Sequence, residues 1–112
     1  MKGLHRIQWL SIFLLASCLT ACQVKRPKVV ISDAKMENVL YDYHIAKAMG
    51  EEVPYTDGYK RVLYIESVFK KHGITQADFD SSMVWFTRNP EVLTKIYEKV
   101  NARLKAERDV VN

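Results

Sequence analysis

The chain has 112 residues, with 17 Lys and Arg against 13 Asp and Glu, and a formal net charge of +4. This length allows a single small domain. Lys2 and Arg6 lie at the start of the chain and acids balance most of the other cations, so we exclude nucleic-acid binding. Both cysteines, Cys18 and Cys22, also lie near the N-terminus, which excludes disulfides and cysteine metal ligands from the rest of the chain.

The first 22 residues have the pattern of a bacterial lipoprotein signal. A basic start is followed by an apolar run over residues 7–19, and residues 19–22 resemble a lipobox in which the small Ala21 precedes Cys22. We expect residues 1–21 to be a signal peptide that is cleaved before Cys22, and Cys22 to carry covalent lipid. The apolar run is shorter than the roughly 20 residues that span a bilayer, so lipid is the expected anchor. The alternatives are an ordinary secretory signal or an uncleaved anchor.

Residues 22–31 are expected to be the lipidated cysteine and a short basic tether. Its cations are too charged to pack in a core, and Pro27 disfavours helix before it. These cations either gain electrostatic free energy from contact with anionic lipid or belong to a simple solvated linker. Gln23 rather than Asp follows Cys22, and no acidic run comes next, which favours the outer membrane and a periplasm-facing domain. The cations are Lys25, Arg26 and Lys28.

Residues 32–112 predict one all-α domain, a small bundle of about four helices. Apolar residues recur at helical spacing, and residues that begin or end helices separate the repeats. Ser32 is the expected first N-cap, Gly73 a left-handed C-cap, and Thr75 the start of a capping box. Asn89 and Pro90 end the third helix and begin the fourth. The expected helices cover residues 32–50, 59–72, 75–89 and 90–109, and no stretch alternates as a strand does.

The same spacing predicts the core. In the first helix it selects Met36, Val39, Leu40, Tyr43, Ala46 and Met49; in the second, Val62, Ile65, Phe69 and His72, widened by Leu63 and Val68; in the third, Phe79, Ser82 or Met83, and Phe86. In the fourth helix, Leu93, Tyr97, Val100 and Leu104 have the spacing of a coiled-coil seam. Packing within the domain is the simpler interpretation, and a homodimer or partner helix through this C-terminal helix is the alternative.

Several segments together resemble a known family. They are Ile31-Ser32, Lys35-Met36, residues 41–44, residues 79–86 and residues 96–100. The chain is similar over residues 27–108 to small lipoproteins that carry a domain of unknown function, family forty-two ninety-six. The resemblance implies a small helical envelope lipoprotein, and it supplies no catalytic residue to carry over.

The sequence shows no catalytic, cofactor-binding or metal-binding constellation, so we expect a protein that is not an enzyme. Asp42 and His44 stand two residues apart on a helix and point in different directions. His72 lies in the last turn of its helix, where capping explains it. Ser81 and Ser82 lack the glycine pattern of a nucleophile elbow. We expect no cofactor apart from the covalent lipid.

We therefore predict a non-catalytic interaction or accessory subunit of an envelope complex, bound to the membrane by its lipid and to another envelope protein. Trp85, Tyr41 and Tyr64 lie off the strongest core stripes, and Arg88 is near Trp85; aromatic and Arg side chains often anchor interfaces. The alternative for Trp85 is packing between helices. The alternative function is a periplasmic chaperone-like module that binds unfolded or apolar peptide segments, on a weak resemblance of residues 72–79 to folding factors.

Overall fold

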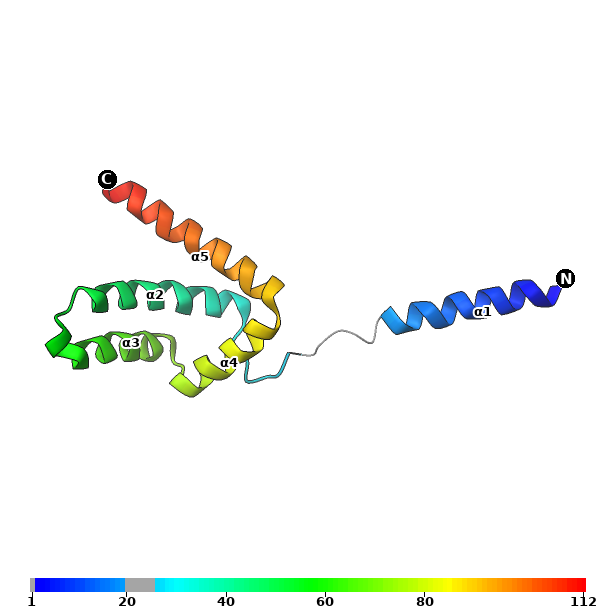
Figure 1. Cartoon of the computed structure of the whole chain (residues 1–112), viewed down its shortest axis with the longest axis horizontal. Coiled ribbons are helices and arrows are strands. Elements are labelled where there is room, and N and C mark those ends of the chain that lie inside the picture. Colours follow the sequence, from blue (N-terminus) through cyan, green and yellow to red (C-terminus); the bar gives the residue numbers. More distant parts are fainter. Residues whose placement is uncertain (1, 20–25) are drawn as a thin grey trace.

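The computed structural model describes residues 2–19 and 26–112, with side chains over residues 3–12 and 26–112 (Figure 1). Ala21, Cys22 and the expected cleavage point lie outside the described residues. The described part is helical and contains no strand, which confirms the all-α prediction. The helices are α1 (Lys2–Leu19), α2 (Asp33–Glu51), the 3₁₀ turn η1 (Tyr55–Asp57), α3 (Gly58–His72), α4 (Gln76–Arg88) and α5 (Pro90–Val111).

Helix α1 lies well apart from the other helices in Figure 1, and its side chains over residues 3–12 are exposed. Among the residues that the structure describes, no helix is both long enough and apolar enough to cross a membrane.

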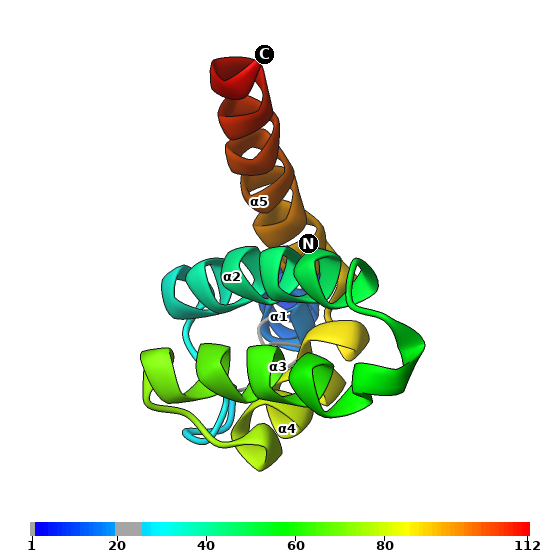
Figure 2. The ribbon, with the colours of Figure 1, turned by 90° about the vertical axis from the view of Figure 1, so that its left-hand side faces the viewer.

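Helices α2 and α3 form an antiparallel pair and lie side by side in both views (Figures 1 and 2). Ser32 caps α2 as expected, its hydroxyl accepting from the Lys35 amide. The helix continues past Gly50 to Glu51, one residue beyond the expected end. Arg61 of α3 explains this end, because its Nε donates to the Gly50 carbonyl at 2.9 Å and its Nη2 donates to the Val53 carbonyl at 2.8 Å. These bonds satisfy carbonyls that the end of a helix leaves free.

The corners on either side of α4 follow local sequence rules. Gly73 has φ +63°, and its amide and that of Ile74 bond back into α3, so the expected left-handed cap is confirmed. Thr75 and Asp78 form the expected capping box. Asn89 and Pro90 mark the break between α4 and α5 as expected. The Asn89 side chain, however, donates to the Trp85 carbonyl at 2.8 Å and makes no side-chain cap on α5.

The core lies where α2 meets α3, α4 and α5. Its fully buried side chains include Met36, Leu40, Phe86 and Val100. Tyr43 stacks on Phe69 of α3 and on Phe79 of α4, with ring centroids 6.5 and 5.2 Å away. The fourth-helix seam packs into this core, with Val100 buried and Leu93, Tyr97 and Leu104 half-buried against it. The interpretation of the seam as packing within the domain is therefore confirmed.

Three expected core residues are exposed. Met49 is exposed because α5 diverges from α2 and leaves its C-terminal half uncovered (Figure 1). Val62 and Leu63 are exposed because α4 contacts only the C-terminal end of α3. There the Phe69 and Phe79 rings lie 5.1 Å apart. The side of α3 that packs into the core instead carries Tyr64, Ile65, Val68 and Phe69.

Candidate interaction surfaces

Residues 26–31 pack against α4 and form what we call the strap. Val30 and Ile31 are buried, and the Ile31 amide donates to the hydroxyl of the fully buried Ser82 at 3.0 Å. The Arg26 guanidinium lies 4.5 Å from the centroid of the Trp85 ring and forms an ion pair with Asp33. The expectation that the cations of the tether are too charged to pack is therefore wrong for Arg26, because a guanidinium can stack on an aromatic face while its charge is paired. Lys28 is exposed, as expected.

Trp85 takes part in this packing. Its ring is half-buried and meets Phe86 edge-on, with centroids 5.2 Å apart. The indole Nε1 is buried and has no hydrogen-bond partner among the described residues. Of the two interpretations of Trp85, the geometry favours packing within the molecule over an exposed anchor.

Tyr41 is also covered. It is buried in the interface between α2 and α5, with the Arg103 guanidinium 3.9 Å from its ring centroid. A hydrogen bond with Glu107, together with burial, raises the pKa of the Tyr41 hydroxyl. The prediction of Tyr41 as an exposed interaction residue is wrong, because α5 packs over the side of α2 that carries it.

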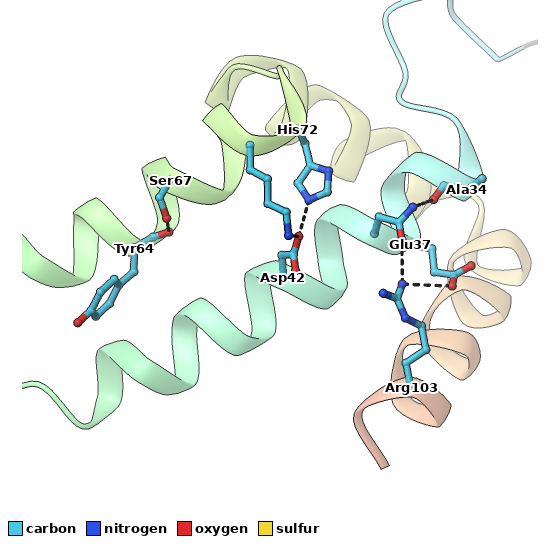
Figure 3. A network of polar contacts seen from close by, with 9 residues as sticks. Ala34, Glu37, Asp42, Tyr64, Ser67, His72 and Arg103 are labelled. Atoms are coloured by element: carbon cyan, nitrogen blue, oxygen red, sulfur yellow. Dashed lines mark hydrogen bonds and ion pairs between the residues drawn. The ribbon is translucent and has the colours of Figure 1, made fainter. Parts of the chain in front are cut away.

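Arg103 also joins α5 to α2 through polar contacts. Its Nη1 donates to the Asn38 amide oxygen at 2.9 Å and lies 3.5 Å from a Glu37 carboxylate oxygen (Figure 3). The same guanidinium thus contacts a ring, an amide and a carboxylate on one helix. These contacts hold α5 against α2, and the C-terminal end of α5 projects away from the other helices (Figure 1).

A second polar cluster joins α2 to the end of α3. One Asp42 carboxylate oxygen lies 2.6 Å from His72 Nε2 and 2.9 Å from Lys71 Nζ (Figure 3). Burial raises the pKa of Asp42, but the hydrogen bonds from Lys71 and His72 outweigh it, and the net pKa lies below its usual value. Local sequence spacing relates Asp42 only to near neighbours such as His44, and it could not identify His72, which is 30 residues away in the chain.

This cluster predicts a pH-dependent loss of stability. Because the folded-state pKa of Asp42 is lowered, its carboxylate stabilises the fold above the usual aspartate pKa of about 4, and this stability is lost as pH falls through the lowered folded pKa. We expect Asp42→Asn to lower the free energy of unfolding by about 1–2 kcal/mol at pH 7. The difference from wild type should shrink below about pH 4. Urea unfolding at several pH values measures this.

Asp80→Asn is the matched control, because Asp80 is exposed on α4. It should change stability by less than about 0.5 kcal/mol. A pH-independent cost for Asp42→Asn would show that its carboxylate charge is not what joins the two helices.

The other two expected interface residues do not join Trp85 and Tyr41 in one patch. Tyr64 is half-buried and lines a hollow of about 220 Å³ together with Asp42 and Met49. Arg88 is exposed at the α4–α5 corner. Tyr41, Tyr64 and Trp85 therefore lie on different parts of the domain.

An exposed apolar surface lies elsewhere, at the turn between α2 and α3. We call it the hairpin face and define it by Tyr55, Tyr59, Val62 and Leu63, which are 90%, 74%, 53% and 40% exposed. Tyr59, Val62 and Leu63 have the spacing that places side chains on one side of a helix, and Tyr55 lies in the turn just before them. Sequence reasoning missed this surface because it assigned Val62 and Leu63 to the core.

Comparison with known proteins gives a family and no activity. The family model described as a domain of unknown function, DUF4296, matches residues 27–110. No curated protein and no solved structure matches the chain.

Proposed function

We propose that the chain, which belongs to the DUF4296 family of domains of unknown function, is a lipid-anchored, non-catalytic interaction subunit of a bacterial envelope complex. The anchor is a lipid on Cys22, added where residues 19–22 resemble a lipobox. Gln23 after the cysteine favours the outer membrane, with the domain facing the periplasm.

The hairpin face is the observation that carries the interaction role. Its two tyrosines and two aliphatic side chains are exposed to water near the turn between α2 and α3. Tyrosine is enriched in the binding hot spots of protein interfaces. The charged groups described above, by contrast, hold helices together: Asp42 joins α2 to α3, and Arg103 joins α2 to α5.

The position of the hairpin face favours a protein as its occupant. Helix α2 has 19 residues, which corresponds to about 28 Å of rise. The strap leads into one end of α2, and the hairpin face lies at the other end (Figure 1). The described chain before α2 therefore leads away from this surface, which supports our assignment of the face to a folded envelope protein.

A pair of matched substitutions tests this role. Val62 and Val84 are both valines on helices, 53% and 52% exposed, but Val84 lies on α4 away from the hairpin face. We expect Val62→Asp to reduce recovery of the partner at least tenfold after in-cell crosslinking and mass spectrometry, and Val84→Asp to leave recovery unchanged. A tenfold loss corresponds to about 1.4 kcal/mol, which exceeds the roughly 1 kcal/mol or less that most interface residues cost when they are truncated.

The identity of the captured proteins decides between functions. One envelope protein recovered in fixed ratio, and lost with Val62→Asp, supports the interaction subunit. Many unrelated outer-membrane clients would instead support the chaperone-like alternative. Capture of only a second copy of this chain, or a partner insensitive to Val62→Asp, would contradict the proposed role of the hairpin face.

A further inference from the structure

We infer that the strap makes the α4–α5 corner the membrane-facing surface of the domain and directs the hairpin face away from the lipid. The occupant of this corner is the phospholipid headgroup layer. This inference rests on the proposed lipid anchor at Cys22, and it adds a fixed orientation that a flexible tether would not provide.

The length of chain before the strap sets the distance to the membrane. Four residue steps separate Cys22 from Arg26, and at about 3.5 Å each they reach at most about 14 Å. If the strap were free, ten steps from Cys22 to Ser32 would reach roughly 35 Å. Because the strap is docked, Arg26 and the Trp85 ring that it contacts stay at a short distance from the lipidated residue.

The strap is attached at both of its ends. At its start, Arg26 lies against Trp85 and is paired with Asp33. At its end, Ile31 is buried and bonded to Ser82 of α4. Between these points the Val30 amide donates to the Pro27 carbonyl at 3.1 Å, which closes a turn. Both ends of the strap are attached to α4 or to the start of α2. The chain that leads to Cys22 therefore leaves the domain at that end.

The arrangement of helices then gives the domain two distinct ends. The strap, the start of α2, the end of α4 and the start of α5 lie together at one end, and η1 lies at the other (Figures 1 and 2). The exposed cations Lys28 and Arg88 belong to the first end. The aromatic side chains Tyr55 and Tyr59 belong to the second.

Tryptophan fluorescence can measure this orientation, because Trp85 is the only tryptophan after Trp9 of the expected signal peptide. The purified lipidated protein is placed in phosphatidylethanolamine–phosphatidylglycerol vesicles that carry a nitroxide quencher on the headgroup. A second protein, Trp85→Phe with Tyr59→Trp, reports from the hairpin face. Phenylalanine keeps an aromatic surface for Arg26, and circular dichroism checks that both proteins fold.

We expect the headgroup nitroxide to quench Trp85 at least three times as strongly as it quenches the tryptophan at position 59. The burial of Trp85 acts against this result, since position 59 is the more exposed. A flexible ten-residue Gly-Ser insertion after Gln23 should lower the quenching of Trp85 and remove most of the difference. Equal quenching of the two positions without the insertion would overturn the inference. Failure of the protein to float with vesicles would instead overturn the proposed lipid anchor.

Discussion

Trp85→Ala should lower the free energy of unfolding by about 3 kcal/mol, the lower end of the range for removing a large aromatic side chain from a core. The lower end applies because the ring is only half-buried. The substitution removes the edge-on contact with Phe86 and the surface on which Arg26 stacks. Urea denaturation followed by circular dichroism measures the change.

Two further substitutions separate packing from surface exposure. Trp85→Phe should cost less than about 1.5 kcal/mol, because it keeps an aromatic ring of similar shape and removes the unpartnered Nε1. Arg88→Ala, three residues along α4 on an exposed position, should change stability by less than about 0.5 kcal/mol. If Trp85→Ala left stability unchanged but abolished partner capture, Trp85 would be an interface anchor after all.

The helix ends could be predicted from sequence because they depend on short-range chemistry. The Ser32 cap, the Thr75–Asp78 capping box and the Gly73 cap each involve residues within a few positions of one another. The local sequence therefore supplies both partners of each bond. The end of the first helix was misplaced at Gly50, because the group that satisfies its carbonyl is Arg61, on the next helix.

The exposed and buried sides of α3 could not be predicted in the same way. Apolar residues occur nearly all around this helix, so periodicity alone allows more than one buried stripe. They are Tyr59, Val62, Leu63, Tyr64, Ile65, Val68 and Phe69. Which stripe is buried depends on how α3 packs against α2 and against the start of α4, and that is a tertiary fact. The hairpin face exists because α4 covers only the end that carries Phe69.

The packing of the strap against α4 could not be predicted from the sequence for a related reason. A charged residue beside a proline has the composition of a solvated linker, and only the three-dimensional position of Trp85 gives Arg26 a surface to stack on. Likewise, Ser82 was recognised as a candidate core position, but its partner, the Ile31 amide, is 51 residues away. Buried polar groups of this kind identify long-range contacts only after both partners are placed.

Cys22→Ala should move the protein from the membrane fraction to the soluble fraction. Each buried methylene of a lipid chain contributes about 0.8 kcal/mol, so several acyl chains hold a protein on a bilayer far more strongly than protein–lipid contacts of a small domain. Fractionation after an alkaline wash, with mass spectrometry of the N-terminal peptide, measures the change. Wild type should begin at Cys22 and carry lipid mass.

Cys18→Ala is the matched control, because Cys18 lies four residues before Cys22 within the expected signal peptide. It should leave both the membrane fraction and the N-terminal peptide unchanged, since the cleaved segment takes its thiol with it. The mature domain should unfold at the same urea concentration with or without the lipid, because its core is formed by residues from Val30 onward. A Cys22→Ala protein that stays with the membrane, or a wild-type N-terminus at another residue, would contradict lipid anchoring at Cys22 and remove the basis for an oriented domain.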